Sequence, residues 1–182
     1  MKDVREIIDS RIAEKEKARN AYQLVTNLFI AASCVLFVTL FIVWSIRSFP
    51  EVDIPSSFYG NTILISLSSL SLHIGIKKLR LDDLSKAHKL VMLAGLLGLI
   101  FGGVQIMGWR EMVLSGQISQ NIVIPFTAIH FLHITVGIVL LYTAMRKIGN
   151  SELHSRNVAF LWQISRFWHF PGLVWLLFIF II

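Results

Sequence analysis

Residues 24–46 read LVTNLFIAASCVLFVTLFIVWSI, a run of 23 residues without one charged side chain. An α-helix rises about 1.5 Å per residue and the hydrocarbon core of a bilayer is about 30 Å thick, so this run is long enough to cross a membrane. Inside lipid every backbone polar group must be paired within the protein, and a helix achieves this within one segment. The stretch therefore predicts a transmembrane helix.

Four more apolar segments of spanning length follow, at residues 58–76, 90–109, 122–145 and 158–182, and only the last carries a charge, Arg166. Of the 182 residues, 55% are apolar and 15% are charged. A soluble domain usually has about 25% charged residues. The sequence therefore predicts an all-α integral membrane protein with five transmembrane helices.

The basic side chains predict the orientation of these helices. Of the 17 lysines and arginines, 14 lie in residues 1–23 and in the second and fourth connections, whereas the first and third connections hold only Arg47 and Arg110. Cytoplasmic loops carry the excess of basic residues, so the N-terminus is expected in the cytoplasm and the C-terminus outside. The same rule accounts for the net charge of +6 without a nucleic-acid partner.

Residues 1–23 are predicted to form a cytoplasmic amphipathic helix that precedes a membrane domain of residues 24–182. Val4, Ile7, Ile8 and Ile12 fall on one face of such a helix. The helix would lie on the membrane surface or dock on a partner subunit, and both alternatives stay open.

Several classes of function are disfavoured by what the spans contain. All eleven acidic residues lie outside the five spans. Proton pumps and ion-coupled transporters normally place an ionisable group at membrane depth, so a transporter acting alone is not favoured. No nucleophile elbow or Ser/His/Asp set of a hydrolase is present. The single cysteine, Cys34, excludes a disulfide framework and a cysteine-based metal cluster within this chain.

Histidines are the main candidates for special chemistry in the spans. His130 and His133 are three residues apart and share a helical face, and His133 and His169 would lie at similar depth if the last two spans pack antiparallel. These side chains would join neighbouring helices or face a partner chain. The alternative is a self-standing membrane cytochrome with bis-histidine haem ligation. Arg166 would bind a lipid phosphate or simply extend toward the headgroups.

Four stretches of the chain, in this order, resemble subunit III of the haem–copper terminal oxidases, such as cytochrome c oxidase. They are Asn61-Thr62 with Ser68-Ser69, then 98–101 (GLIF) with Gln105 and Trp109, then 127–134 (TAIHFLHI) with Gly137, and finally 167–170 (FWHF) with Val174-Trp175. Together they cover about residues 55–182. Shorter bacterial members of this family have five helices, in agreement with the count and orientation predicted above.

The resemblance implies a non-catalytic subunit of an oxidoreductase complex in a bacterial inner membrane. Haem and copper belong to the partner subunits I and II, and this chain is expected to hold neither. It would pack on subunit I, bind phospholipid in a cleft between two groups of helices, and sustain proton uptake and turnover in aerobic respiration. The residues expected at helix-packing or lipid-cleft positions are Asn61, Gln105, His130, His133, Trp168 and His169.

The chain departs from the family pattern at three places. Ser33 or its neighbour stands where many members have an intramembrane glutamate, Phe131 replaces a glycine, and Phe170-Pro171-Gly172 lacks the aspartate that follows WHFV. Roles that need those carboxylates are not carried over. Two related alternatives stay open, namely subunit III of a quinol oxidase and the accessory protein of nitric oxide reductase. Residues 1–23 could also contact another respiratory complex.

Overall fold

The computed structural model describes residues 2–47, 54–116 and 122–181. All regular structure in these ranges is helical, which confirms the predicted all-α fold, and five of the helices are long and apolar enough to cross a membrane. The elements are α1 (Lys2–Ile46), α2 (Ser56–Arg80), α3 (Leu84–Leu114), α4 (Val123–Gly149), a short 3-10 turn η1 (Ser155–Asn157) and α5 (Ala159–Ile181).

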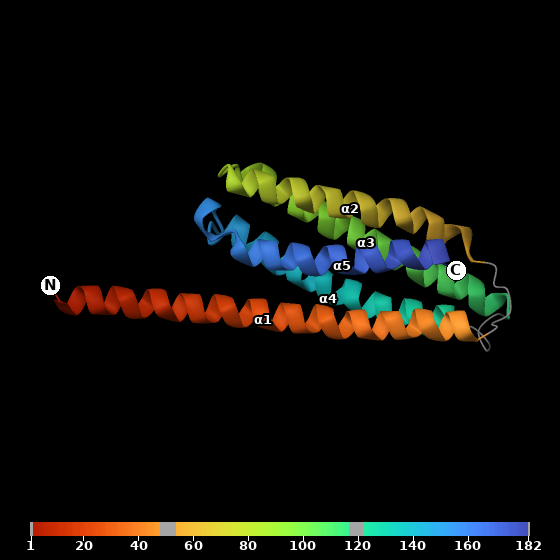
Figure 1. Cartoon of the computed structure of the whole chain (residues 1–182). Helices are drawn as coiled ribbons and strands as arrows, with labels where there is room; N and C mark the ends of the chain where they lie inside the picture. Colours follow the sequence, from red (N-terminus) through yellow and green to blue (C-terminus); the bar gives the residue numbers. More distant parts are fainter. Residues whose placement is uncertain (1, 48–53, 117–121, 182) are drawn as a thin grey trace.

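Helices α2 to α5 form a closed four-helix ring, in which α2 contacts α3, α3 contacts α4, α4 contacts α5 and α5 contacts α2. Helix α3 therefore lies diagonally across the ring from α5. Helix α1 runs beside the ring and packs on α5, and its N-terminal part extends beyond the other helices (Figure 1).

Helix α1 is continuous from residue 2 to residue 46, so no break is visible at the predicted division after residue 23. Its sequence contains no glycine or proline, the two residues that most readily interrupt a helix. At about 1.5 Å per residue, its 45 residues span about 68 Å, roughly twice the thickness of a bilayer core. Val4, Ile7, Ile8 and Ile12 are exposed along the projecting part.

Two connections are tied together at one end of the ring. Asp82 adopts a left-handed backbone conformation (φ 55°) between α2 and α3. Its carboxylate accepts hydrogen bonds from the backbone N–H (2.9 Å) and the hydroxyl (2.7 Å) of Ser155 in η1. The next residue, Asp83, caps α3 by accepting from the Lys86 N–H (3.2 Å), and Lys86 lowers the pKa of this exposed carboxyl group. These bonds hold the ends of α2 and α3 against the start of α5.

Candidate functional site

Trp168 of α5 is the central packing residue of the ring, and it contacts all three other helices. Its indole N–H donates to the Ser68 hydroxyl of α2 (3.1 Å), which in turn donates to the Ala94 carbonyl of α3 (2.7 Å). A methyl group added at Gly98 of α3 would lie 2.6 Å from the indole, and one added at Gly137 of α4 would lie 2.5 Å from it. The two glycines therefore create the space that the fully buried tryptophan fills.

A second set of polar side chains is buried in the same ring. His130 of α4 lies beside the Pro171 carbonyl of α5, with its Nε2 at 2.9 Å, and Asn61 of α2 donates to the Phe101 carbonyl of α3 (3.4 Å). A carbonyl only accepts, so the proton of the neutral His130 ring lies on Nε2. Gln105 of α3 is fully buried, and neither atom of its amide has a hydrogen-bond partner among the described residues.

Aromatic rings enclose this polar set. The ring of Trp175 lies 5.2 Å from His130 and 5.1 Å from Phe101, measured between ring centroids. Its indole N–H also donates to the Thr62 hydroxyl of α2 (3.3 Å). His130 is therefore shielded by aromatic surface, and both His130 and Asn61 are bonded to a neighbouring helix.

His133 connects α1 to the ring. Its Nδ1–H donates to the Ile129 carbonyl one turn earlier (2.8 Å), so in the neutral ring Nε2 is an acceptor. The Ser33 hydroxyl of α1 donates to that nitrogen at 2.8 Å. The rings of Phe29 and Phe37 pack around the contact, with centroids 5.5 and 5.2 Å from the imidazole.

His169 and Arg166 lie outside the polar core. Arg166 is exposed, whereas His169 is half-buried and lines a small recess with Ser66 and Ser69 of α2. His133 instead faces α1, and both of its ring nitrogens are hydrogen-bonded. In this arrangement neither nitrogen of His133 is free to bind iron together with His169.

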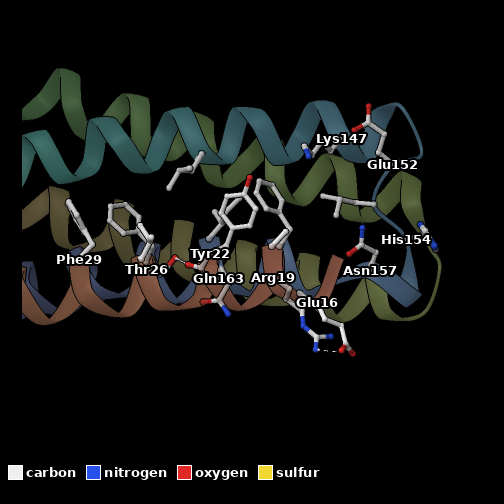
Figure 2. Close-up of a pocket in the computed structure, with 18 of the residues that line it drawn as sticks. Glu16, Arg19, Tyr22, Thr26, Phe29, Lys147, Glu152, His154, Asn157 and Gln163 are labelled. Atoms are coloured by element: carbon white, nitrogen blue, oxygen red, sulfur yellow. Dashed lines mark hydrogen bonds and ion pairs between the residues drawn. The ribbon is translucent and has the colours of Figure 1, made fainter. Parts of the chain in front are cut away.

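A groove of about 870 Å³ lies between α1 and the α4–α5 pair, and we call it the α1 groove. Figure 2 shows its polar mouth, where Glu16 and Arg19 of α1 lie opposite Lys147, Glu152 and His154. The deeper part is lined mainly by apolar side chains, which include Val25, Phe29, Val136, Leu140, Phe160, Ile164 and Phe167. The groove therefore has the polarity of an amphiphile, charged at one end and apolar along its length.

The polar groups of the ring are arranged to join helices. No group of three or more His, Cys, Asp or Glu side chains in the described ranges could hold a metal ion. The buried hydrogen bonds of Trp168, His130, Asn61 and His133 each end on another helix, apart from the local Ile129 contact. Such bonds and close small-residue contacts are the usual means of helix association in membranes.

No family model matches the chain, but several characterised proteins are similar to it over most of its length. Cytochrome c oxidase subunit 3 of Synechocystis sp. is 26% identical over 82% of this chain and 69% of its own length. Cytochrome bo(3) ubiquinol oxidase subunit 3 of Buchnera aphidicola is 24% identical over 82% of this chain and 79% of its own length. The corresponding protein of Pseudomonas aeruginosa is 25% identical over 82% of this chain and 78% of its own length.

The fold and its polar core define a multi-pass helical membrane protein whose internal polar residues bind helix to helix. The relatives confirm the more specific resemblance, and the chain is related to subunit III of the haem–copper oxidases. It is therefore similar to subunits of respiratory oxidase complexes.

Proposed function

We propose that this chain is the non-catalytic subunit III of a haem–copper terminal oxidase in a bacterial inner membrane. Its N-terminus lies in the cytoplasm and its C-terminus outside. It packs on subunit I, while haem and copper are held by the partner subunits. The observation that carries the proposal is that Trp168 and His130, both buried in the ring, bond to other helices in a chain similar to oxidase subunits.

The α1 groove is the best candidate for the lipid-binding part of this role. Its volume of about 870 Å³ is in the range of small-molecule sites. Its charged mouth lies on the side where the sequence predicts the cytoplasm, so a phospholipid of the inner leaflet would place its headgroup beside Arg19 and Lys147. Bound lipid would support α1, which has few other contacts with the ring, and this support would help to sustain proton uptake and turnover.

The electron donor is a separate part of the proposal. Relatives named as subunits of cytochrome c oxidase and of ubiquinol oxidase match the chain with similar identity. The quinol oxidase is therefore the second candidate complex. Oxygen consumption of the purified complex with reduced cytochrome c, or with a quinol, distinguishes the two.

The experiment that tests the assignment is purification of the native complex through a tag on this chain. Reduced-minus-oxidised visible spectra are recorded before and after the chain is stripped off with detergent. We expect haem bands in the complex, and we expect them to stay with the other subunits after stripping. Haem that leaves with this chain, or a tagged chain that purifies without any haem protein, would contradict the proposal.

A further inference from the structure

Not every ionisable side chain within the predicted spans lies inside the ring. His130 and His133 are buried and hydrogen-bonded. His73 and Arg166, in contrast, are exposed, and His169 is only half-buried. An ionisable side chain at membrane depth rarely faces lipid, because the charged form is costly there.

His169 lies beside Ser66 and Ser69 of α2, and Arg166 is three residues earlier on the same face of α5. The two helices run antiparallel, because Arg80 lies over the Trp162 ring at one end (5.4 Å) and Trp175 bonds to Thr62 toward the other. We define the α2–α5 seam as the polar line between these points, and it consists of Ser69, His73 and Arg80 of α2 with Trp162, Arg166 and His169 of α5. Positions 162, 166 and 169 share one face of α5 by their helical spacing.

The charged side chains of the α2–α5 seam are all basic. Neither α2 nor α5 contains an aspartate or glutamate. Arg80 and Arg166 are cationic, and the two imidazoles can donate a hydrogen bond in any protonation state. The seam therefore offers donors and positive charge, and neither of its two helices supplies an acidic side chain.

The shape of the seam also favours an inserted group. A recess of about 280 Å³ is lined by Ser66, Ser69, His169 and Gly172, with the apolar side chains of Leu173 and Leu176 at its border. The Gly172 position is close to α2, since a methyl group added there would lie 3.4 Å from the Ser69 hydroxyl. Small residues of this kind allow another helix to approach closely.

We propose that the α2–α5 seam is the surface on which a membrane-spanning segment of a partner oxidase subunit docks, and that this segment places a carboxylate opposite Arg166 and His169. The identity of the partner complex rests on the proposed function above, whereas the position of the surface and the acidic partner group rest on the seam itself.

The length of the seam favours a protein over a lipid as the occupant. Arg80 and Ser69 are 11 residues apart in α2, which is about 16 Å along the helix axis. The polar headgroup layer is only about 5–8 Å thick on each side of a bilayer. A phospholipid bound at Arg80 would thus lay its acyl chains over His169 and Ser69, whereas a helix can offer polar groups along the whole line.

The test places a photo-crosslinking side chain at Leu173, at the border of the seam, in the intact complex purified through this chain. The matched control is Leu99 of α3, across the ring from α5, because 58% of its surface is exposed compared with 57% for Leu173. We expect Leu173 to crosslink to a membrane-spanning peptide of a partner subunit that contains Asp or Glu, and Leu99 to label lipid. Labelling of lipid alone at Leu173, no protein adduct there, or a protein adduct only from Leu99 would overturn the proposal.

Substitutions at Arg166 test the charge requirement. Breaking a hydrogen-bonded ion pair at an interface usually costs enough to weaken binding at least about tenfold. We expect Arg166→Leu to lower the partner subunit recovered per tagged chain by about that factor, and Arg166→Lys to restore most of it. If Arg166→Leu and the native chain recover equal amounts of the partner subunit, the partner places no carboxylate opposite Arg166. If the complex contains haem subunits but the seam does not crosslink to them, the seam proposal fails and the proposed function stands.

Discussion

The hydroxyl of Ser33 on α1 lies 2.8 Å from Nε2 of His133 on α4, and this hydrogen bond crosses 100 residues of sequence. It is a buried polar contact between α1 and the ring. By the resemblance to oxidase subunit III, Ser33 or its neighbour stands where an intramembrane glutamate is expected. Here the link needs no carboxylate, because a neutral hydroxyl donates to a neutral imidazole.

Replacing Ser33 with alanine should loosen α1. The buried Nε2 of His133 would lose its partner, and an unsatisfied buried acceptor costs about 1–3 kcal/mol. We expect a lower midpoint for thermal dissociation of the complex and faster proteolysis within α1. Ser45→Ala is the matched control, because the Ser45 hydroxyl bonds only to the Phe41 carbonyl of its own exposed helix turn. An equal fall in the dissociation midpoint of both variants would show that the Ser33 hydrogen bond does not hold α1 to the ring.

Replacing Gly98 with alanine should disrupt the packing of Trp168. The added methyl group would meet the indole at 2.6 Å, and overpacking of this kind costs about 1–3 kcal/mol. Gly103→Ala on the same helix meets nothing within 4 Å. It should be neutral or stabilise α3 by up to about 1 kcal/mol, because alanine favours helices more than glycine does. Thermal unfolding of the purified chain in detergent compares the two, and a Gly98→Ala variant as stable as Gly103→Ala would contradict the packing argument.

The five helices could be predicted because uncharged length is read directly from the sequence. The residues at which these helices begin and end could not be predicted. Helix α3 runs over Leu84–Leu114, beyond the predicted span 90–109, because polar residues outside a bilayer continue a helix as well as apolar ones do. The same holds for α1, where the change from charged to apolar residues near position 23 marks no break in the backbone.

The sequence shows which polar side chains lie within apolar runs, but it does not show which residues they contact. Ser33 is 100 residues from His133, and Pro171 is 41 residues from His130. A single sequence holds no signal for such long-range pairs. The α1 groove was also not predictable residue by residue, because its volume depends on how far α1 stands from α4 and α5.

Replacing Gln105 with leucine should be tolerated. Its amide is fully buried and makes no hydrogen bond with the described residues, so an apolar side chain of similar size loses no protein contact and avoids the cost of burying polar atoms. We expect unchanged or higher thermal stability. Asn61→Leu provides the contrast, because it removes the bond to the Phe101 carbonyl and should destabilise by about 1 kcal/mol. A large loss of thermal stability in Gln105→Leu would show that the amide has a bound partner, such as an internal water.

Filling the α1 groove should displace bound lipid without disturbing the ring. Val136 and Val139 are three residues apart on α4 and 46% and 59% exposed, but only Val136 lines the groove. Val136→Trp would place an indole where an acyl chain is proposed to lie, whereas Val139→Trp adds the same side chain outside it. We expect the phospholipid phosphorus retained per complex, measured after extensive detergent washing, to fall by about one lipid in Val136→Trp and to stay unchanged in Val139→Trp. If oxidase turnover declines faster over repeated cycles only in the lipid-depleted variant, lipid in this groove supports the complex. Equal phosphorus content in the two variants would place the retained lipid elsewhere.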